Sequence, residues 1–236
     1  MINSDKLAKV RFSEKSEVEK YSTPKIKRVE FLIKRFLKPN SKILEVGCAS
    51  GGICIPLAKK GFDVTGIDFS EKMIEKAKEN KRKYKIKNLK LKLLDVRELK
   101  EKNKYDHVLG LFNLLTYTNK EEDRKKMLKN MITALKPKGV LIMDMANKYG
   151  NLKLLIKEIL YAFYFFIKRI KFSFGDVYVK PRKGLKTILF QHYLSKNEIK
   201  KCLKEIPNIK YKFYDFSLFL QRKTKKDFIV VVKKIK

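Results

Sequence analysis

The strongest constraint on the fold is the alternation of two apolar patterns between residues 42 and 145. Short apolar runs that are typical of buried strands alternate with longer amphipathic stretches that are typical of helices. Such an order predicts a mostly parallel, doubly wound α/β sheet with helices on both faces. The predicted strands are 42–47, 62–67, 89–95, 105–111 and 139–145, and the predicted helices are 51–60, 70–83 and 121–135, the last of them followed by a turn at 137–139.

Further elements flank this alternation on both sides. On the N-terminal side, Ser22, Thr23 and Pro24 begin a helix with one apolar face, and Pro39 with Asn40 ends it. On the C-terminal side the predicted elements are an aromatic helix at 151–171, a hairpin with strands at 177–179 and 187–193, a short helix that starts at 195, and two strands at 209–216 and 228–232.

The charge of the chain is strongly positive, with 58 Lys and Arg residues against 25 Asp and Glu residues and a formal net charge of +33. A charge of this size suggests a nucleic acid or an anionic membrane as a partner. However, 49 of the basic residues are lysine and nine are arginine, whereas base and phosphate recognition favours the planar arginine fork. Much of the charge is therefore interpreted as a compositional bias towards lysine.

Three cysteines and two histidines form no CxxC pair and no Cys/His cluster, so we predict neither a metal site nor a disulfide framework. The first 20 residues lack the apolar segment of a signal peptide. The longest apolar run, 159–167, has nine residues, whereas a membrane-spanning helix needs about 20. The sequence therefore predicts a cytoplasmic protein without a transmembrane segment.

A turn of small residues follows the first predicted strand, with the sequence EVGCASGG at 45–52. Glycine tolerates unusual dihedral angles and lets the backbone approach a ligand closely. The turn lacks the Lys-Ser/Thr ending of a triphosphate-binding loop. Asp68 comes after the second predicted strand, where a carboxylate can accept both hydroxyls of a ribose. Each feature alone also fits a structural role, as a tight connection or a helix cap.

Two more features follow in order, because Asp95 ends the third predicted strand and the fourth leads into Phe112 and Asn113. With them, the chain resembles the class I S-adenosylmethionine-dependent methyltransferases over about residues 40–147. The resemblance implies S-adenosyl-L-methionine as the cofactor, bound by Glu45, Gly47, Cys48, Ala49, Gly51, Asp68, Phe69, Met73, Asp95, Val96, Phe112 and Asn113.

The resemblance also divides these residues by the part of the cofactor that each would hold. Gly47, Ala49 and Gly51 would lie under the methionine moiety, and Asp68 would bind the ribose. Asp95 and Val96 would flank the adenine, with Phe69 and Met73 packing on its faces. Phe112 and Asn113 would line the cofactor and the acceptor pocket. One departure is Ala49, which stands where the family usually has glycine.

The fold that the resemblance implies is Rossmann-like, a mostly parallel seven-stranded sheet with an antiparallel closing strand and an inserted helix-hairpin cap. The expected division of the chain is an N-terminal helical cap at 1–40, a cofactor-binding core at 41–147, an inserted lid or acceptor region at 148–194, and the C-terminal helix and closing strands of the same domain at 195–236.

The implied activity is the transfer of a methyl group from the sulfonium to a small organic acceptor. Because that methyl is already activated, alignment of the acceptor and exclusion of water can supply about 7 to 11 kcal/mol of the barrier reduction. No residue is assigned as the catalytic base. His192 and Tyr117 are the candidates, with Tyr193 and Asp176 as further polar groups, and a packed strand residue is the alternative interpretation of His192.

Other functions stay open from the sequence. The positive field fits a tRNA or rRNA methyltransferase, and the few acid and base residues fit a module that binds S-adenosylmethionine without turnover. The aromatic helix at 151–171 fits a cap that shapes the acceptor pocket, a basic amphipathic helix that rests on an anionic membrane surface, or a dimer contact.

Overall fold

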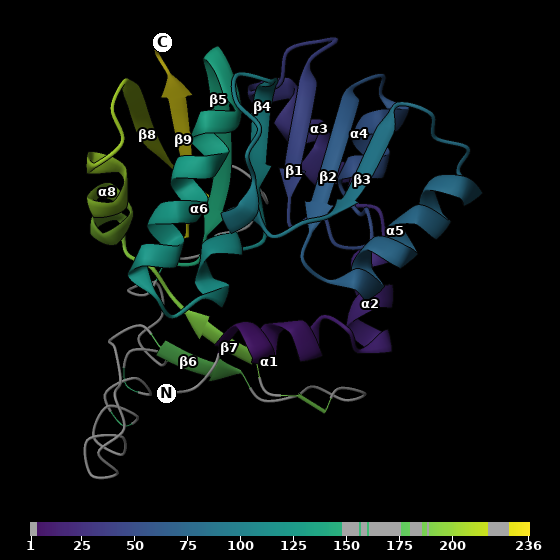
Figure 1. Cartoon of the computed structure of the whole chain (residues 1–236), viewed down its shortest axis with the longest axis horizontal. Coiled ribbons are helices and arrows are strands. Elements are labelled where there is room, and N and C mark those ends of the chain that lie inside the picture. The colour runs from purple at the N-terminus through teal and green to yellow at the C-terminus, as the bar shows by residue number, and fades with distance from the viewer. Residues whose placement is uncertain are drawn as a thin grey trace.

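The computed structural model describes residues 4–147, 156, 160, 176–179, 186–187, 189–216 and 227–236. Its centre is a seven-stranded sheet in the order β3-β2-β1-β4-β5-β9-β8 (Figure 1). The strands are β1 Lys42–Val46, β2 Asp63–Asp68, β3 Leu89–Leu93, β4 Tyr105–Gly110, β5 Leu135–Met145, β8 Ile209–Asp215 and β9 Phe228–Lys234. Strands β1 to β5 pair in parallel, whereas β9 runs antiparallel to both β5 and β8. The predicted sheet with its antiparallel closing strand is thus confirmed.

Helices cover both faces of the sheet, because side chains along each strand alternate between two apolar cores. In β1, Leu44 and Val46 point into one core and Ile43 into the other. The first core includes α6 and α8, and the second includes α3, α4 and part of α5. The bounds of these helices are α3 Ile26–Arg35, α4 Cys54–Lys59, α5 Glu71–Lys83, α6 Glu121–Ala134 and α8 Lys196–Lys204.

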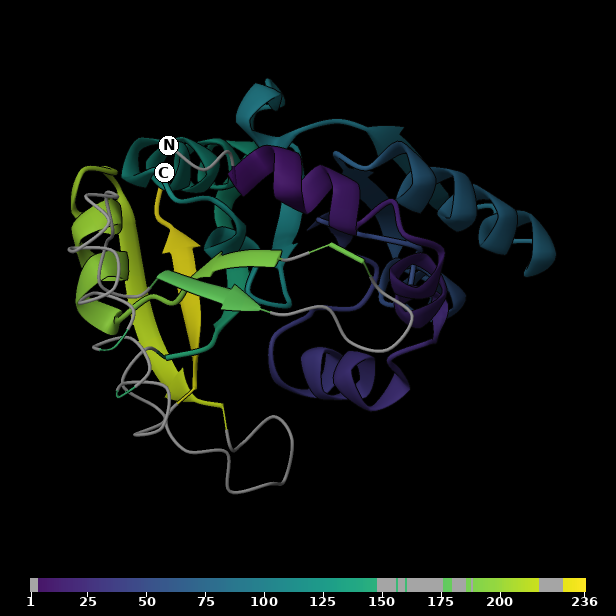
Figure 2. The ribbon, with the colours of Figure 1, turned by 90° about the horizontal axis from the view of Figure 1, so that it is seen from below.

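A separate layer lies below the carboxyl ends of β1 and β2, as Figures 1 and 2 show. It consists of the N-terminal helices α1 (Ser4–Arg11) and α2 (Lys15–Ser22) and of a two-stranded hairpin formed by β6 (Asp176–Val179) and β7 (Leu189–His192). Helix α1 contacts β7 directly. We call residues 4–22, which form α1, α2 and the link between them, the roof. Strand order reverses between β1 and β4, so the roof covers the place where doubly wound sheets bind ligands.

Several boundaries differ from those predicted, among them three at the predicted turns and strand ends. Helix α4 begins at Cys54 rather than at 51, because Gly51 has a φ of +92° that no helix allows. Strand β5 begins at Leu135, so the predicted turn at 137–139 lies inside it. A register shift against β4 and a φ of +66° at Lys138 accommodate the turn residues within the ladder. Strand β3 ends at Leu93, before Asp95.

The N-terminal cap also contains more than the sequence pattern indicates, because α1 and α2 precede the one helix predicted there, α3. The predicted helix at 151–171 lies outside the described residues except for Ile156 and Leu160, which are helical. Among the described residues, no helix combines the length and the apolar character needed to cross a membrane.

Candidate functional site

The loop after β1 is folded tightly onto the end of β2. The amides of Gly47 and Cys48 both donate to the carbonyl of Ile67, at 2.8 and 3.0 Å. Gly47 has a φ of +69°, and a Cβ there would lie 2.9 Å from Cδ1 of Leu114. Ala49 adopts a left-handed φ of +46°, a conformation that strains a non-glycine residue by about 1 to 2 kcal/mol. The turn therefore needs glycine at 47 and tolerates alanine at 49.

Asp68 at the end of β2 closes this loop from the other side. Its Oδ2 accepts from the Ala49 amide at 2.8 Å and its Oδ1 from the Ser70 amide at 2.9 Å. Burial raises the pKa of Asp68 to about 6, although backbone hydrogen bonds from Ser70 and Ala49 act in the opposite direction. Each carboxylate oxygen has a second lone pair, so Asp68 can accept further hydrogen bonds.

Two adjoining cavities, of about 60 and 40 Å³, lie between this loop and the roof. Both are lined by Gly47, Asp68, Phe69, Leu114 and Tyr117. Pockets for ligands the size of a drug or cofactor usually enclose about 300 to 1,000 Å³. A ligand of that size therefore fits only after side chains that line the cavities have moved apart.

The roof closes the site mainly with aromatic rings. The Phe12 ring makes edge-to-face contacts with Tyr21, Phe69 and Tyr117, at centroid distances of 6.0, 6.1 and 5.2 Å. Tyr21 also meets Phe112 edge to face at 6.1 Å. Sequence reasoning missed the roof residues of the site. The one available signal was the apolar pair Ala8 and Phe12, four residues apart on one helical face.

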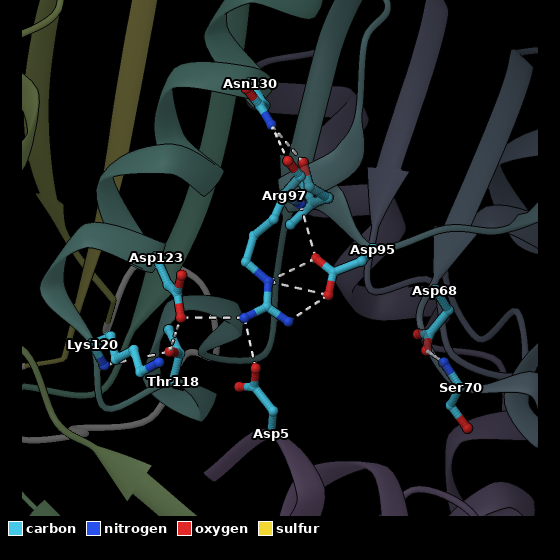
Figure 3. A network of polar contacts seen from close by, with 10 residues as sticks. Asp5, Asp68, Ser70, Asp95, Arg97, Thr118, Lys120, Asp123 and Asn130 are labelled. Carbon is cyan, nitrogen blue, oxygen red and sulfur yellow. Dashed lines mark hydrogen bonds and ion pairs between the residues drawn. The ribbon is translucent and has the colours of Figure 1, made fainter. Parts of the chain in front are cut away.

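The end of β3 adds a second carboxylate to the larger cavity, as Figure 3 shows. Asp95 caps the short helix η1 (Val96–Glu98) by accepting from the amide of Arg97 at 2.9 Å. The Arg97 guanidinium donates to both oxygens of the same carboxylate. Although burial alone would raise it, these hydrogen bonds hold the pKa of Asp95 below its usual value.

The end of β4 is held in an unusual backbone conformation, with left-handed φ angles of +59° at Phe112 and +60° at Asn113. The Asn113 amide donates to Oδ1 of Asp144 at 3.0 Å, and its side-chain oxygen accepts from the Ala146 amide. Arg28 pairs with the other oxygen of Asp144 at 2.9 Å and lies 4.1 Å from the centre of the Phe112 ring. This network fixes the Phe112 ring at the wall of the smaller cavity.

The structure brings most of the predicted cofactor residues to the cavities and leaves others behind the loop. Those that line a cavity are Gly47, Ala49, Asp68, Phe69, Met73, Asp95, Val96 and Phe112. Met73 lies on the smaller cavity with Ala49, apart from Asp95 and Val96. Glu45, Cys48, Gly51 and Asn113 line neither.

Glu45 is fully buried behind the loop, and burial raises its pKa well above the usual value. Its Oε2 has no hydrogen-bond partner among the described residues. Burial therefore favours the neutral form of this carboxyl. Cys48 is also buried, at 2% exposure. These two side chains pack beneath the loop and support it from inside.

The two candidate catalytic residues lie in different places. Tyr117 lines both cavities, and its hydroxyl donates to the carbonyl of Phe112 at 3.3 Å. His192 lines neither cavity, and its Nδ1 and Nε2 lie 2.7 Å from Asp176 and 3.3 Å from Glu198. Burial acts to lower the pKa of His192, but these two carboxylates raise it overall. His192 on β7 thus contacts β6 through Nδ1 and α8 through Nε2.

The remaining predicted groups take no part in the cavity walls. The Tyr193 hydroxyl donates to the side chain of Gln191 at 3.3 Å. His107 is a buried residue of β4, its Nε2 accepts from the Lys38 amide, and burial lowers its pKa to about 4. In the part of the chain that the structure describes, no group of three or more His, Cys, Asp or Glu side chains is placed to hold a metal ion.

Comparisons with known proteins agree with this geometry. A family model for a methyltransferase domain matches residues 37–205. A glycine/sarcosine N-methyltransferase from Halorhodospira halochloris is 36% identical over 126 residues, which are 52% of this chain and 47% of that protein. A ubiquinone biosynthesis O-methyltransferase from Pelagibacter ubique is 33% identical over 121 residues, 50% of this chain and 48% of that protein. The chain thus spans about half the length of these relatives.

The fold is also found in solved structures. A SAM-dependent methyltransferase from Methanosarcina mazei superposes with a TM-score of 0.69 at 23% identity, over 86% of this chain and 97% of that chain. This likeness confirms the class I architecture predicted from the sequence. Because the family model covers well over half of the residues, the chain belongs to the methyltransferase domain family, the S-adenosylmethionine-dependent enzymes that its motifs resemble.

Proposed function

We propose that the chain transfers a methyl group from S-adenosyl-L-methionine to a small organic acceptor. The observation that carries this proposal is that Asp68 and Gly47 both line each of the two cavities. The residues fit the cofactor, because a Cβ at Gly47 would collide with Leu114 and only glycine leaves the backbone open to a ligand. Asp68 would hold the ribose, and Asp95 with Val96 would flank the adenine.

The chemistry asks little of the protein beyond orientation. When bound, the cofactor supplies a methyl group that its positive sulfur has already activated. The rings of Phe12, Tyr21, Phe112 and Tyr117 surround the smaller cavity, where they exclude water and favour a cation by about 0.5 to 2 kcal/mol. Burial raises the pKa of the Tyr117 phenol well above its usual value, so this hydroxyl stays protonated and does not act as a base towards the methyl acceptor.

The acceptor that suits these walls is compact and largely apolar. Among the described residues, neither cavity is lined by a histidine. We therefore propose an acceptor whose attacking atom is already unprotonated at neutral pH and needs no base to remove a proton. Residues 148–194, which include the hairpin next to α1, are proposed as the acceptor region. The contact between β7 and α1 supports this assignment.

The cofactor affinity is expected to depend on pH through Asp68, whose pKa is raised to about 6. The ionised carboxylate accepts ribose hydroxyls better than the neutral acid. Affinity should therefore be constant above about pH 7 and fall towards tenfold per unit well below pH 6. Calorimetric titration with S-adenosylhomocysteine between about pH 5 and pH 8 measures this. An affinity that stays level over that range would exclude Asp68 as the ribose ligand.

The same pKa shift has a defined sign for stability. The folded pKa lies above the ordinary value of 3.8, so the folded protein binds a proton more tightly than the unfolded chain. Protonation of Asp68 therefore stabilises the folded protein. This contribution to the free energy of unfolding is fully present below about pH 4 and is lost as the pH rises through about 6.

Two measurements test the proposed activity directly. Calorimetric titration with S-adenosylmethionine separates a cofactor-binding protein from one that shares only the fold. Incubation of the protein with a deuteriomethyl donor and a cell extract, followed by mass spectrometry, identifies any compound that gains the heavy methyl. Binding without labelled product and without release of S-adenosylhomocysteine would indicate a binding module that does not turn over.

An RNA acceptor is the second candidate, and the formal charge of +33 favours it. Binding that neutralises phosphates weakens steeply with salt, by a slope of about 0.9 per contact on a logarithmic scale. Affinity for tRNA or rRNA fragments should then fall strongly between low and moderate salt. A flat affinity over that range would exclude this candidate.

We also propose a cytoplasmic location, which the three buried free thiols support. Contact with an anionic membrane is a further proposal, supported by the exposed side chains of Ile156 and Leu160 one helical turn apart. Both are exposed by more than half, at 51% and 64%. Sedimentation with anionic vesicles tests the contact, which should be lost when Ile156 and Leu160 are replaced by serine.

A further inference from the structure

Arg97 connects three separate elements with one guanidinium group, as Figure 3 shows. It is bidentate to Asp95 after β3, and its Nη1 also reaches Asp5 in the first turn of α1 at 2.6 Å and Asp123 in α6 at 3.2 Å. The residues that these bonds join to Arg97 lie two, 92 and 26 positions away in the chain. The guanidinium therefore ties the roof to the wall of the larger cavity.

The backbone beneath Arg97 is fixed independently of these ion pairs. The side-chain amide of Asn130 in α6 donates to the carbonyls of both Val96 and Arg97, at 2.9 and 3.0 Å. The Arg97 side chain is only 23% exposed. A fixed base and partial burial reduce the freedom that the side chain must lose to hold three carboxylates.

The charges of α1 match this wall of the cavity. Asp5 meets Arg97, while Lys9, one helical turn further along α1, lines the same cavity and lowers the pKa of Asp95 by its positive charge. Helix α1 thus places the anionic Asp5 against Arg97 and the cationic Lys9 near Asp95. Without Arg97, three carboxylates would face one another across the edge of the roof, and their repulsion would push α1 outwards.

We propose that Arg97 is a positioning residue that holds α1 closed over the cofactor through Asp5 while it orients the Asp95 carboxylate. This inference rests on the proposed function, because it assumes that the cofactor binds in the cavities below α1. Asp5, Lys9 and Arg97 all line the larger cavity, so α1 covers it while the Arg97–Asp5 pair is in place. Release of the cofactor therefore requires the Arg97–Asp5 pair to break, and this pair limits the rate of dissociation.

The first test measures how fast the cofactor product leaves. Asp5→Asn removes the roof arm of the network and leaves the bidentate Arg97–Asp95 pair in place. Release of tritiated S-adenosylhomocysteine, chased with unlabelled compound, should become about threefold to tenfold faster, as expected for a partly exposed charge-assisted pair. The equilibrium affinity should fall by the same factor, and kcat should change less than the KM for the cofactor.

A matched control is Asp123, the other carboxylate that pairs with Nη1 of Arg97. Asp123→Asn removes a carboxylate that is 25% exposed and bonded to the same Nη1, but it lies in α6, outside the roof. This variant should release the product at the rate of the unchanged protein. Asp5→Glu should restore most of the slow release. Raising the salt from about 0.05 to 0.5 M should speed release from the unchanged protein but not from Asp5→Asn.

A second readout does not depend on the cofactor. Hydrogen exchange of the α1 amides in the ligand-free protein should be faster in Asp5→Asn than in Asp123→Asn. Equal release rates and equal exchange in these two variants would overturn the inference even though the cofactor binds. If no variant binds the cofactor, the proposed function fails, and the exchange rates of α1 still decide whether Arg97 holds the roof.

Discussion

Replacing Asp68 by alanine should lower the affinity for S-adenosylmethionine by at least about 100-fold. The substitution removes an acceptor for two ribose hydroxyls, and hydrogen bonds to a charged group contribute about 1.5 to 3 kcal/mol each. It also leaves the amides of Ala49 and Ser70 without their acceptor, so the loop after β1 loses its anchor on β2. Calorimetric titration with both S-adenosylmethionine and S-adenosylhomocysteine measures the loss.

A control for Asp68 exists at the opposite end of the same strand. Asp63 is 48% exposed and pairs with Lys42 at 3.7 Å, far from the cavities. Asp63→Ala should leave the affinity unchanged. Asp68→Asn should bind with intermediate affinity and should lose the fall in affinity below pH 6, since an amide does not titrate. If Asp68→Ala bound within threefold of the unchanged protein, the proposed site would be wrong.

Replacing Gly47 by alanine should reduce cofactor affinity by at least about 30-fold. The new Cβ would lie 2.9 Å from Cδ1 of Leu114, and both residues line both cavities. Leu114 would have to shift, and it lines the space that the cofactor would occupy. The φ of +69° adds strain for any residue with a Cβ, about 1 to 2 kcal/mol of the free energy of unfolding.

Gly61 separates these two effects. It has a φ of +91°, but a Cβ added there meets nothing within 4 Å. Gly61→Ala should therefore lower the free energy of unfolding by a similar amount and leave the cofactor affinity unchanged. Denaturant unfolding and calorimetric titration of the two variants test this pair. Equal loss of affinity in both would mean that strain, and not the shape of the cavity, explains the effect at Gly47.

The sheet could be predicted because its signals are local. The apolar runs of β1 to β5 and the periodicity of the helices between them depend on neighbours only a few residues apart. The start of β5 escaped prediction for the opposite reason. Pro137 and Gly139 are typical turn residues, yet pairing with β4, including its register shift after Tyr105, draws them into the strand.

The first half of the site could be predicted in the same way, since Gly47 and Asp68 follow adjacent strands of one sheet. The roof could not. No spacing rule relates Asp5 to Arg97 across 92 positions, or Phe12 to Tyr117, because docking of a separate segment brings them together. His192 shows the same limit: the sequence identified a titratable ring, but the fold places a carboxylate at each of its nitrogens.

The contact between the roof and residues 186–187 determines which of its residues can be substituted without losing it. Glu14 accepts from the backbone amides of Lys186 and Thr187, both at 2.8 Å, and Arg11 donates to the Thr187 carbonyl at 2.6 Å. Only one partner contributes side chains to these three bonds. Mutational tolerance should therefore differ between the two sides. Substitutions at Lys186 and Thr187 preserve these three bonds, although Thr187 also hydrogen-bonds Glu14 through its side chain, whereas substitutions at Glu14 and Arg11 remove them. The residues at 186 and 187 can therefore change during selection for a new methyl acceptor, while their backbone hydrogen bonds to the roof are kept.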